Sequence, residues 1–306
     1  MILREVLLPL LVCPECHNKL SLTVSKRDGD NITEGLLKCN SCEKAFPIVR
    51  GIPRFVDSDA YVRSFSAEWN IFSCTQLDLR ENHETFVNKT GLLPEKLAGS
   101  TVLEAGCGMG RFLEVVSRER SATIVGFDLS LAVESAYANF GLRQNVHIVQ
   151  ADVMSPPFSQ GSFDAIYSIG VLHHTSDPEA AFDKLVPLLK KGGEVAVWVY
   201  AKPRLPILSD FYRIFTCRMP WSLVLALSRL LIKTYTLQSM SRYIALILPI
   251  SMLPDPERRL LDTFDWYSPR FQFKYRTPEV IAWFRRVGLE DLRVLSFPVS
   301  VSGVRP

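Results

Sequence analysis

The residues best suited to chemistry lie in a glycine-rich turn at residues 104–110. Glu104 comes two positions before Gly106, and Gly108 and Gly110 follow at every second position. Glycine is needed where the backbone takes a positive φ or lies against a ligand. The spacing differs from the dinucleotide pattern G-x-G-x-x-G, and the turn lacks the G-K-[S/T] of a phosphate loop. Because an acid here would repel phosphates, the turn predicts a ligand with an ammonium or a sulfonium group.

Apolar residues on both sides predict that the turn joins a strand to a helix. Val102 and Leu103 end a short apolar run, and the four apolar residues between 112 and 116 give the following helix an apolar face. In an open parallel sheet, this unit forms a nucleotide crevice. Asp128 ends the next apolar segment, where a carboxylate can accept hydrogen bonds from both ribose hydroxyls of an adenosine.

The order of the later segments predicts an α/β fold, because apolar strands alternate with helices as in right-handed β–α–β units. We expect a doubly wound, mostly parallel seven-stranded sheet with a C-terminal antiparallel strand, together with a small N-terminal zinc-ribbon domain and a helical insertion. Residues 190–193 are expected to close the helix before the fifth strand. The strands predicted after the turn are 122–128, 146–152, 163–170, 194–200, 289–298 and 299–304.

Two motifs resemble those of one enzyme family. Glu104-x-Gly106-x-Gly108-x-Gly110 resembles the first motif of class I S-adenosylmethionine (SAM) methyltransferases, and residues 163–174 resemble the fourth motif of their methyltransferase-11, quinone-methyltransferase-like branch. The resemblance covers about residues 65–200 and implies SAM as the methyl donor. It also implies that Asp152 reaches the adenine amine and that Val153 packs on the ring. The full set of expected cofactor-binding residues is Phe65, Trp69, Glu104, Gly106, Gly108, Gly110, Arg111, Asp128, Leu129, Asp152, Val153 and Ile169.

Three of these residues have an alternative interpretation. Phe65 and Trp69 lie on a segment that resembles the one closing over the cofactor in related methyltransferases, although a helix packed on the core would show the same spacing. Arg111 is expected to pair with the methionine carboxylate of SAM. The alternative for Arg111 is a solvent-exposed place in the first turn of the helix.

His173 and His174 are the predicted catalytic residues. They follow the fourth strand, where they would face the crevice. A hydroxyl acceptor gains from a general base, and a histidine has a suitable pKa. An orienting or packing role for these histidines stays open.

Two Cys-x-x-Cys pairs predict a zinc site near the N-terminus. Cys13, Cys16, Cys39 and Cys42 can offer four thiolates to one tetrahedral ion, and seven cysteines in the whole chain do not favour disulfides. The segment resembles the small zinc-ribbon subunit that activates several methyltransferases. Residues 1–60 hold eight Lys/Arg and eight Asp/Glu. This balance favours a structural zinc ribbon over one that captures substrate.

We divide the chain into a zinc-ribbon domain (1–57), a helical linker and cofactor lid (58–100) and a SAM-dependent methyltransferase domain (101–306). A helical insertion at 201–265 lies within the last domain. Its residues 201–260 contain nine Lys/Arg against three Asp/Glu, and its apolar runs are shorter than a membrane span. The insertion is interpreted as a substrate lid, a homodimer contact or a peripheral membrane contact.

The sequence favours transfer of a methyl group from SAM to a small-molecule, sugar or natural-product acceptor at oxygen. With a net charge of +3, a nucleic-acid partner is not expected. The alternatives are an RNA base methyltransferase that captures substrate with its zinc ribbon, and a SAM-binding partner subunit without catalysis. The cysteine content and the lack of a signal peptide favour a cytoplasmic location.

Overall fold

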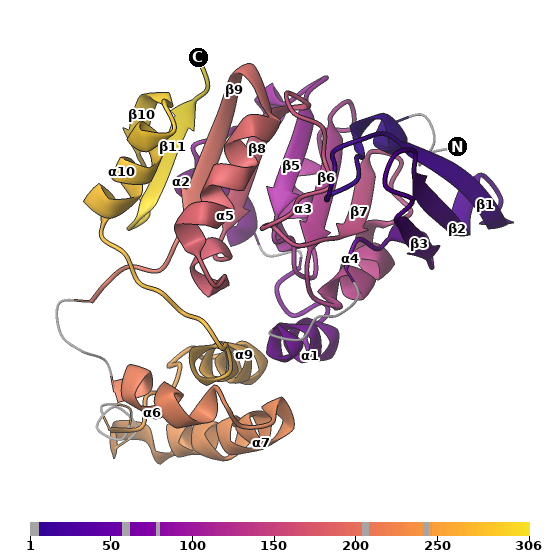
Figure 1. Cartoon of the computed structure of the whole chain (residues 1–306). Coiled ribbons are helices and arrows are strands. Elements are labelled where there is room, and N and C mark those ends of the chain that lie inside the picture. The colour runs from indigo at the N-terminus through magenta and orange to yellow at the C-terminus, as the bar shows by residue number, and fades with distance from the viewer. Residues whose placement is uncertain (1–5, 57–61, 78–79, 204–207, 241–244, 246) are drawn as a thin grey trace.

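A seven-stranded sheet forms the centre of the protein (Figure 1). The computed structural model describes residues 6–56, 62–77, 80–203, 208–240, 245 and 247–306. The strand order is β10-β11-β9-β8-β5-β6-β7, which confirms the predicted sheet. The strands are β5 (Thr101–Ala105), β6 (Thr123–Asp128), β7 (Val146–Gln150), β8 (Phe163–Ile169), β9 (Leu189–Trp198), β10 (Glu290–Val294) and β11 (Ser300–Val304).

The direction of the strands places one edge of the sheet at the site. β5 pairs in parallel with β6 and with β8, and β8 pairs in parallel with β9. β11 runs antiparallel to both β9 and β10, as predicted for a C-terminal strand. The carboxyl ends of β5, β6, β8 and β9 therefore meet at one edge, which is where ligands bind in such sheets.

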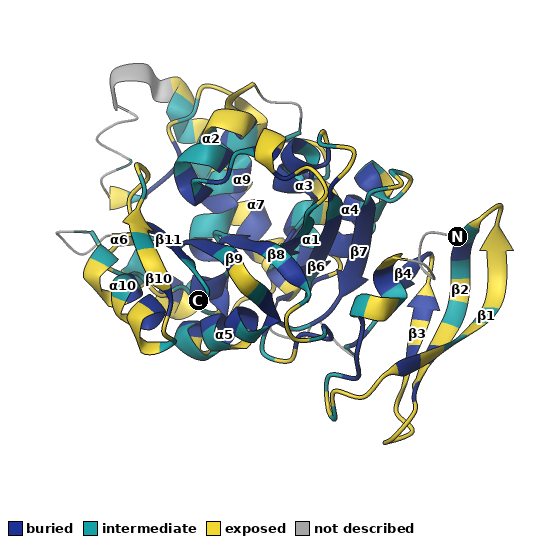
Figure 2. Ribbon diagram, turned by 90° about the horizontal axis from the view of Figure 1, so that it is seen from above, coloured by how far each residue is buried: buried dark blue, intermediate teal, exposed yellow. Residues whose placement is uncertain are grey.

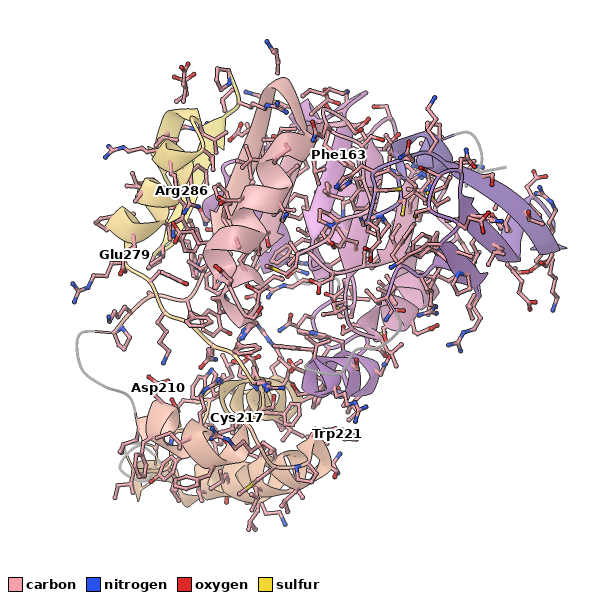
Figure 3. The ribbon with its side chains drawn as sticks, viewed as in Figure 1. Phe163, Asp210, Cys217, Trp221, Glu279 and Arg286 are labelled. Carbon is pink, nitrogen blue, oxygen red and sulfur yellow. The ribbon has the colours of Figure 1, made fainter. Side chains whose placement is uncertain are left out.

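Two clusters of buried apolar side chains cover the two faces of the sheet. One joins the strands to α2 (Glu81–Thr90), α3 (Arg111–Val116) and α4 (Ala132–Phe140). The other joins them to α5 (Pro178–Leu185) and α10 (Thr277–Arg286). Arg286 of α10 (Figure 3) also pairs with Asp183 of α5 at 2.6 Å. Helices on both faces are the doubly wound arrangement.

The helix before the fifth strand ends earlier than predicted. α5 stops at Leu185, a 3-10 turn spans Val186–Leu188, and residues 190–193 belong to β9. Pro187 lies in that turn, and proline cannot continue a helix because it has no N–H to donate. Gly192 and Gly193 then exchange backbone hydrogen bonds with Arg305, at 2.7 and 2.9 Å. The two glycines therefore extend the sheet and do not end the helix.

The N-terminal segment forms a small antiparallel sheet that packs against the large one. Its strands are β1 (Leu20–Asp28), β2 (Asn31–Cys39), β3 (Ala45–Val49) and β4 (Ile52–Pro53). Leu7 and Leu11 share a buried cluster with Phe158, and the Phe55 N–H donates to the Gln150 carbonyl at the end of β7 (2.8 Å). The far strand β1 is largely exposed, whereas β7 is buried (Figure 2). The ribbon therefore covers β7, which is the edge strand of the central sheet.

The insertion forms a helical layer beside the carboxyl edge of the sheet (Figure 1). It contains α6 (Leu208–Thr216), α7 (Trp221–Leu231), the 3-10 segment Ile232–Met240 and α9 (Pro256–Tyr267). Phe72 follows α1 (Arg63–Ile71) directly in the chain. It packs with apolar residues of α7 and α9 in a third buried cluster. In the part of the chain that the structure describes, no helix is both long and apolar enough to cross a membrane.

Candidate active site

The glycine turn after β5 has the left-handed backbone that its sequence predicts. Gly106, Gly108 and Gly110 have φ of 80°, 51° and 97°. A Cβ on Gly106 would lie 2.3 Å from both γ carbons of Val171, and one on Gly110 would lie 2.6 Å from the Phe140 ring. A larger residue at either position would displace packed side chains. The tight turn leaves room for a ligand at the end of β5.

A cavity of about 300 Å³ opens over this turn. It is large enough for part of a nucleoside-sized ligand and open to solvent on one side. Of the predicted cofactor-binding and catalytic residues, Gly110 and His173 do not line the cavity. Gly110 lies against the Phe140 ring. The predicted residues that do line the cavity are Phe65, Trp69, Glu104, Gly106, Gly108, Arg111, Asp128, Leu129, Asp152, Val153, Ile169 and His174.

Asp128 is held in place at the carboxyl end of β6. Its carboxylate accepts hydrogen bonds from the Gly108 N–H (3.0 Å) and from the N–H and hydroxyl of Ser130 (2.8 and 2.7 Å). Burial raises its pKa, and these donors oppose the rise. The carboxylate is thus fixed at the cavity wall beside the glycine turn, where an acid can accept hydrogen bonds from a ribose.

Glu104 and Asp152 are the other two acids at strand ends on this wall. Glu104 is 3% exposed and accepts a hydrogen bond from the Tyr167 hydroxyl at 3.0 Å. Burial raises its pKa well above the ordinary value. Asp152 accepts a hydrogen bond from the Met154 N–H at 2.9 Å, and burial raises its pKa as well. A cationic ligand would stabilise the ionised form of both acids.

Helix α1 covers the open side of the cavity. A Cβ on Gly108 would come within 3.4 Å of the Trp69 indole nitrogen, so this ring lies over the glycine turn. The centroid of the Phe65 ring lies 5.0 Å from that of His174. Both aromatic rings therefore lie where a lid over the cavity would place them. Their contact with the cofactor stays a prediction.

The two histidines occupy different places. The Nδ1 of His174 lies 2.8 Å from the Phe271 carbonyl, which can only accept, so Nδ1 carries the proton. Burial lowers the pKa of His174 to about 4. The ring nitrogens of His173 have no hydrogen-bond partner among the residues that the structure describes, and its ring lies 4.0 Å from that of Tyr200. Burial lowers its pKa well below the ordinary value. A base with so low a pKa is inefficient near neutral pH, so the predicted catalytic role gains no support here.

Other residues of the cavity were missed by the sequence interpretation. Lys89 of α2 is 7% exposed, burial lowers its pKa to about 7, and its Nζ lies 3.4 Å from the centroid of Trp198. Arg111 donates to Asn82 (2.9 Å) and Gln76 (3.4 Å). Lys89 and Arg111 place positive charge on one side of the cavity. Three acids, Glu68, Asp262 and Asp265, line the same cavity together with Tyr200.

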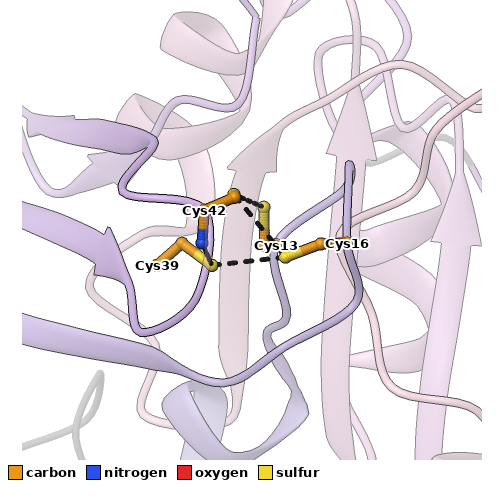
Figure 4. A group of neighbouring side chains, drawn as sticks. All are labelled: Cys13, Cys16, Cys39 and Cys42. Atoms are coloured by element: carbon orange, nitrogen blue, oxygen red, sulfur yellow. Dashed lines mark hydrogen bonds between the residues drawn. The ribbon is translucent and has the colours of Figure 1, made fainter.

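The four predicted metal ligands converge in the ribbon (Figure 4). All four sulfur atoms lie within 4.8 Å of one another, with the Cys16–Cys39 pair at 3.4 Å and the Cys13–Cys42 pair at 3.5 Å. These separations are far above the S–S bond of about 2 Å, so the residues are not disulfides. Four converging thiols are the donor set of a structural zinc site, and the cluster can bind that ion.

Comparison with known proteins defines the class of this chain. Residues 103–197 match the family described as a methyltransferase domain, and residues 4–51 match the family described as Trm112p-like protein. The chain thus carries a SAM-dependent methyltransferase domain, with SAM as the cofactor of its class. This domain is joined in one polypeptide to a Trm112p-like domain with four metal-ligating cysteines.

The relatives differ in the acceptors that their names give. The tRNA (carboxymethyluridine(34)-5-O)-methyltransferase alkbh8 of Xenopus tropicalis is 34% identical over 106 residues, covering 34% of this chain and 16% of that protein. Phosphoethanolamine N-methyltransferase 1 of Arabidopsis thaliana is 31% identical over 166 residues, covering 51% of this chain and 32% of that protein. Four further relatives that are 30–36% identical also have names of tRNA methyltransferases or tRNA carboxymethyltransferases. The chain spans a third or less of the first two relatives' length.

A solved structure is also similar in part to this chain. It is the complex between the Trm112 methyltransferase activator of Haloferax volcanii and a methyltransferase, with a TM-score of 0.48 and 15% identity. The match covers 79% of this chain and 97% of that chain.

The relatives correct two predictions from the sequence. The small-molecule acceptor is wrong as the first interpretation, because five of these six relatives have names of tRNA methyltransferases or tRNA carboxymethyltransferases. The methylated atom stays a prediction. The expectation that nucleic acid is not a partner is wrong for the same reason. A net charge of +3 is a sum over the whole chain, whereas an RNA contact needs only a local group of cations and aromatic rings.

Proposed function

We propose that this chain transfers the methyl group of SAM to RNA, with tRNA as the first substrate to test. The relatives whose names give tRNA methyltransferases or tRNA carboxymethyltransferases support it. We also propose that the domain boundaries lie at residues 57 and 100 and that the ribbon has a structural role.

The observation that carries the proposal is a second cavity beside the first. It has a volume of about 360 Å³, and Trp198 and Tyr200 line both cavities. Trp266 and Phe297 add aromatic walls, and Lys274, which pairs with Asp210, lines the same cavity. Enzymes that modify a base take it out of the stack and hold it against aromatic side chains, while cations contact the backbone. The second cavity suits a base in this position.

The residues at the junction would position the donor and the acceptor. SAM would supply an electrophilic methyl group on its sulfonium. Asp128 and Asp152 would orient the adenosine part, while Lys89 and Arg111 would attract the methionine carboxylate. Trp198 and Tyr200 would hold the base at the side of the cavity away from Asp128. Methyl transfer depends mainly on such positioning of two reactants in line.

Methyl transfer to total tRNA tests the proposal directly. We expect labelled methyl groups from SAM to enter tRNA from cells that lack this gene, and transfer to weaken steeply with added salt. Phosphoethanolamine serves as the small-molecule control, since one relative carries that name. Methylation of phosphoethanolamine alone would contradict the proposal. SAM binding without transfer to either would instead favour the non-catalytic partner subunit.

A further inference from the structure

Three carboxylates from outside the central sheet face the cavity. Glu68 belongs to α1, whereas Asp262 and Asp265 belong to α9, almost two hundred residues later. Glu68 is 0% exposed, and neither of its carboxylate oxygens has a hydrogen-bond partner within the described residues. The Asp265 carboxylate accepts from the Tyr200 hydroxyl at 2.7 Å, and Asp262 accepts from the Ser251 hydroxyl at 3.2 Å.

A buried carboxylate without a partner points to a ligand that donates hydrogen bonds. Desolvating such a group costs several kcal/mol by order of magnitude, and proteins keep it only where something compensates. Among the described residues, no lysine or arginine forms an ion pair with Glu68 within 4 Å. The missing partner is therefore a hydrogen-bond donor that enters the cavity.

The position of the three acids favours the acceptor over SAM as that donor. Asp265 bonds to Tyr200, which lines both cavities, and Trp266 beside it lines the second cavity. Asp265 therefore lies at the junction of the two cavities, and Glu68 and Asp262 line the first cavity near it. The strand-end acids Asp128 and Asp152 are on the other side, at β6 and β7, and already provide for the adenosine part of SAM.

We propose that Glu68, Asp262 and Asp265 form an acidic site that binds the N–H groups of a nucleobase, and that Glu68 removes the proton from the nitrogen that is methylated. This inference rests on the proposed RNA methyltransferase function and specifies its acceptor atom. Carboxylates accept hydrogen bonds from the amino groups of bases. A carboxylate acceptor, as in the name of the Xenopus relative, would add a fourth negative charge and be repelled.

The chemical step balances with the groups in the cavity. The bond between the methyl carbon and sulfur breaks, and a bond between that carbon and the base nitrogen forms. The sulfonium becomes the thioether of S-adenosylhomocysteine, and the nitrogen passes its proton to the Glu68 carboxylate. Burial and the nearby charges of Asp265 and Asp262 raise the pKa of Glu68 well above its ordinary value, which suits a base that takes and releases a proton.

The variant Glu68→Gln tests the role of the base. It keeps the shape of the side chain and removes the charge, and we expect it to fold because it replaces an unpaired buried acid. Methyl transfer to RNA should fall about 100-fold or more, since general-base catalysis contributes about 10²–10⁴-fold. The affinity for SAM, measured by calorimetry, should stay within about threefold. Glu84→Gln on the exposed face of α2 is the matched control and should transfer at the parent rate.

The methylated RNA identifies the acceptor atom. After digestion to nucleosides, mass spectrometry of RNA from the parent enzyme should show the methyl group on a base nitrogen. A methyl group on a carboxyl or ribose oxygen would overturn this inference and leave the RNA function intact. A Glu68→Gln enzyme within threefold of the parent rate would overturn the role of Glu68. Transfer to phosphoethanolamine with none to RNA would overturn the proposed function itself.

Discussion

At the scale of residues, the cavity is organised by charge. Acids at the strand ends face the proposed adenosine side, Lys89 and Arg111 face the proposed methionine carboxylate, and the group around Glu68 faces the proposed acceptor. Glu68, Lys89 and Glu104 are buried and the other charged groups are partly buried. Their interactions with a ligand are therefore stronger than in water.

We expect Asp128→Asn to weaken SAM binding by about 10- to 100-fold, because hydrogen bonds to a charged group contribute about 1.5–3 kcal/mol. Calorimetry measures the change. Asp291→Asn, on the exposed strand β10, is the control and should bind like the parent. Equal affinities of the parent and Asp128→Asn would remove Asp128 from the cofactor site.

The contribution of Glu68 to the stability of the unliganded protein should fall as the pH rises. The folded state raises the pKa of Glu68 above its ordinary value of 4.5, so it binds more protons than the unfolded chain. The contribution of protonated Glu68 to the free energy of unfolding is therefore fully present below pH 4.5. It is lost as the pH rises through the pKa of the folded state. Thermal unfolding at several pH values should show a shallower decline for Glu68→Gln than for the parent. Parallel declines would mean that Glu68 has no raised pKa.

At the scale of elements, helix α1 connects the cavity to the helical insertion. Its Trp69 lies over the glycine turn, and the same side chain packs against the apolar cluster of α7 and α9. α9 in turn carries two of the three acids. A ligand that orders α1 would therefore also fix α9. The lid, homodimer and membrane interpretations of residues 201–265 stay predictions.

Trp69→Ala should weaken SAM binding by roughly tenfold, because the indole ring covers the turn. Ile71→Ala changes an exposed side chain of the same helix and should leave the affinity unchanged. Calorimetry on both variants separates a cofactor contact from a general effect on α1. If both variants bind SAM as the parent does, α1 is only a structural helix.

At the scale of the whole molecule, the ribbon and the methyltransferase domain share one apolar core. Leu11 and Phe158 belong to the same buried cluster, and Phe55 bonds to the end of β7. The ion that orders the cysteine cluster should then stabilise the catalytic domain as well, because metal binding couples to folding.

Metal analysis should find about one zinc per chain, and Cys42→Ser should lower the melting temperature by roughly 5–10 °C. The matched control is Cys74→Ser, an exposed cysteine outside the cluster, which should leave the melting temperature almost unchanged. Less than about half a zinc per chain would contradict the metal site.

The amino-acid sequence is enough to predict the parts that depend on local spacing. They are the glycine turn, the acids at the ends of β6 and β7, and the two Cys-x-x-Cys pairs, each within a few residues of the elements that position it. The alternation of strands and helices then determined the sheet. A periodic pattern of apolar residues and the handedness of the chain leave few other arrangements.

The meeting of side chains at the acceptor side follows from the folded structure alone. Glu68 of α1 and Lys89 of α2 line one cavity, and no spacing in the sequence predicts this. Burial also decided the state of the histidines, since the sequence shows a histidine but not its desolvation. For the same reason, the net charge led to the wrong expectation that nucleic acid is not a partner. Recognition depends on which charges and rings the fold brings together, and a sum over the chain does not contain that information.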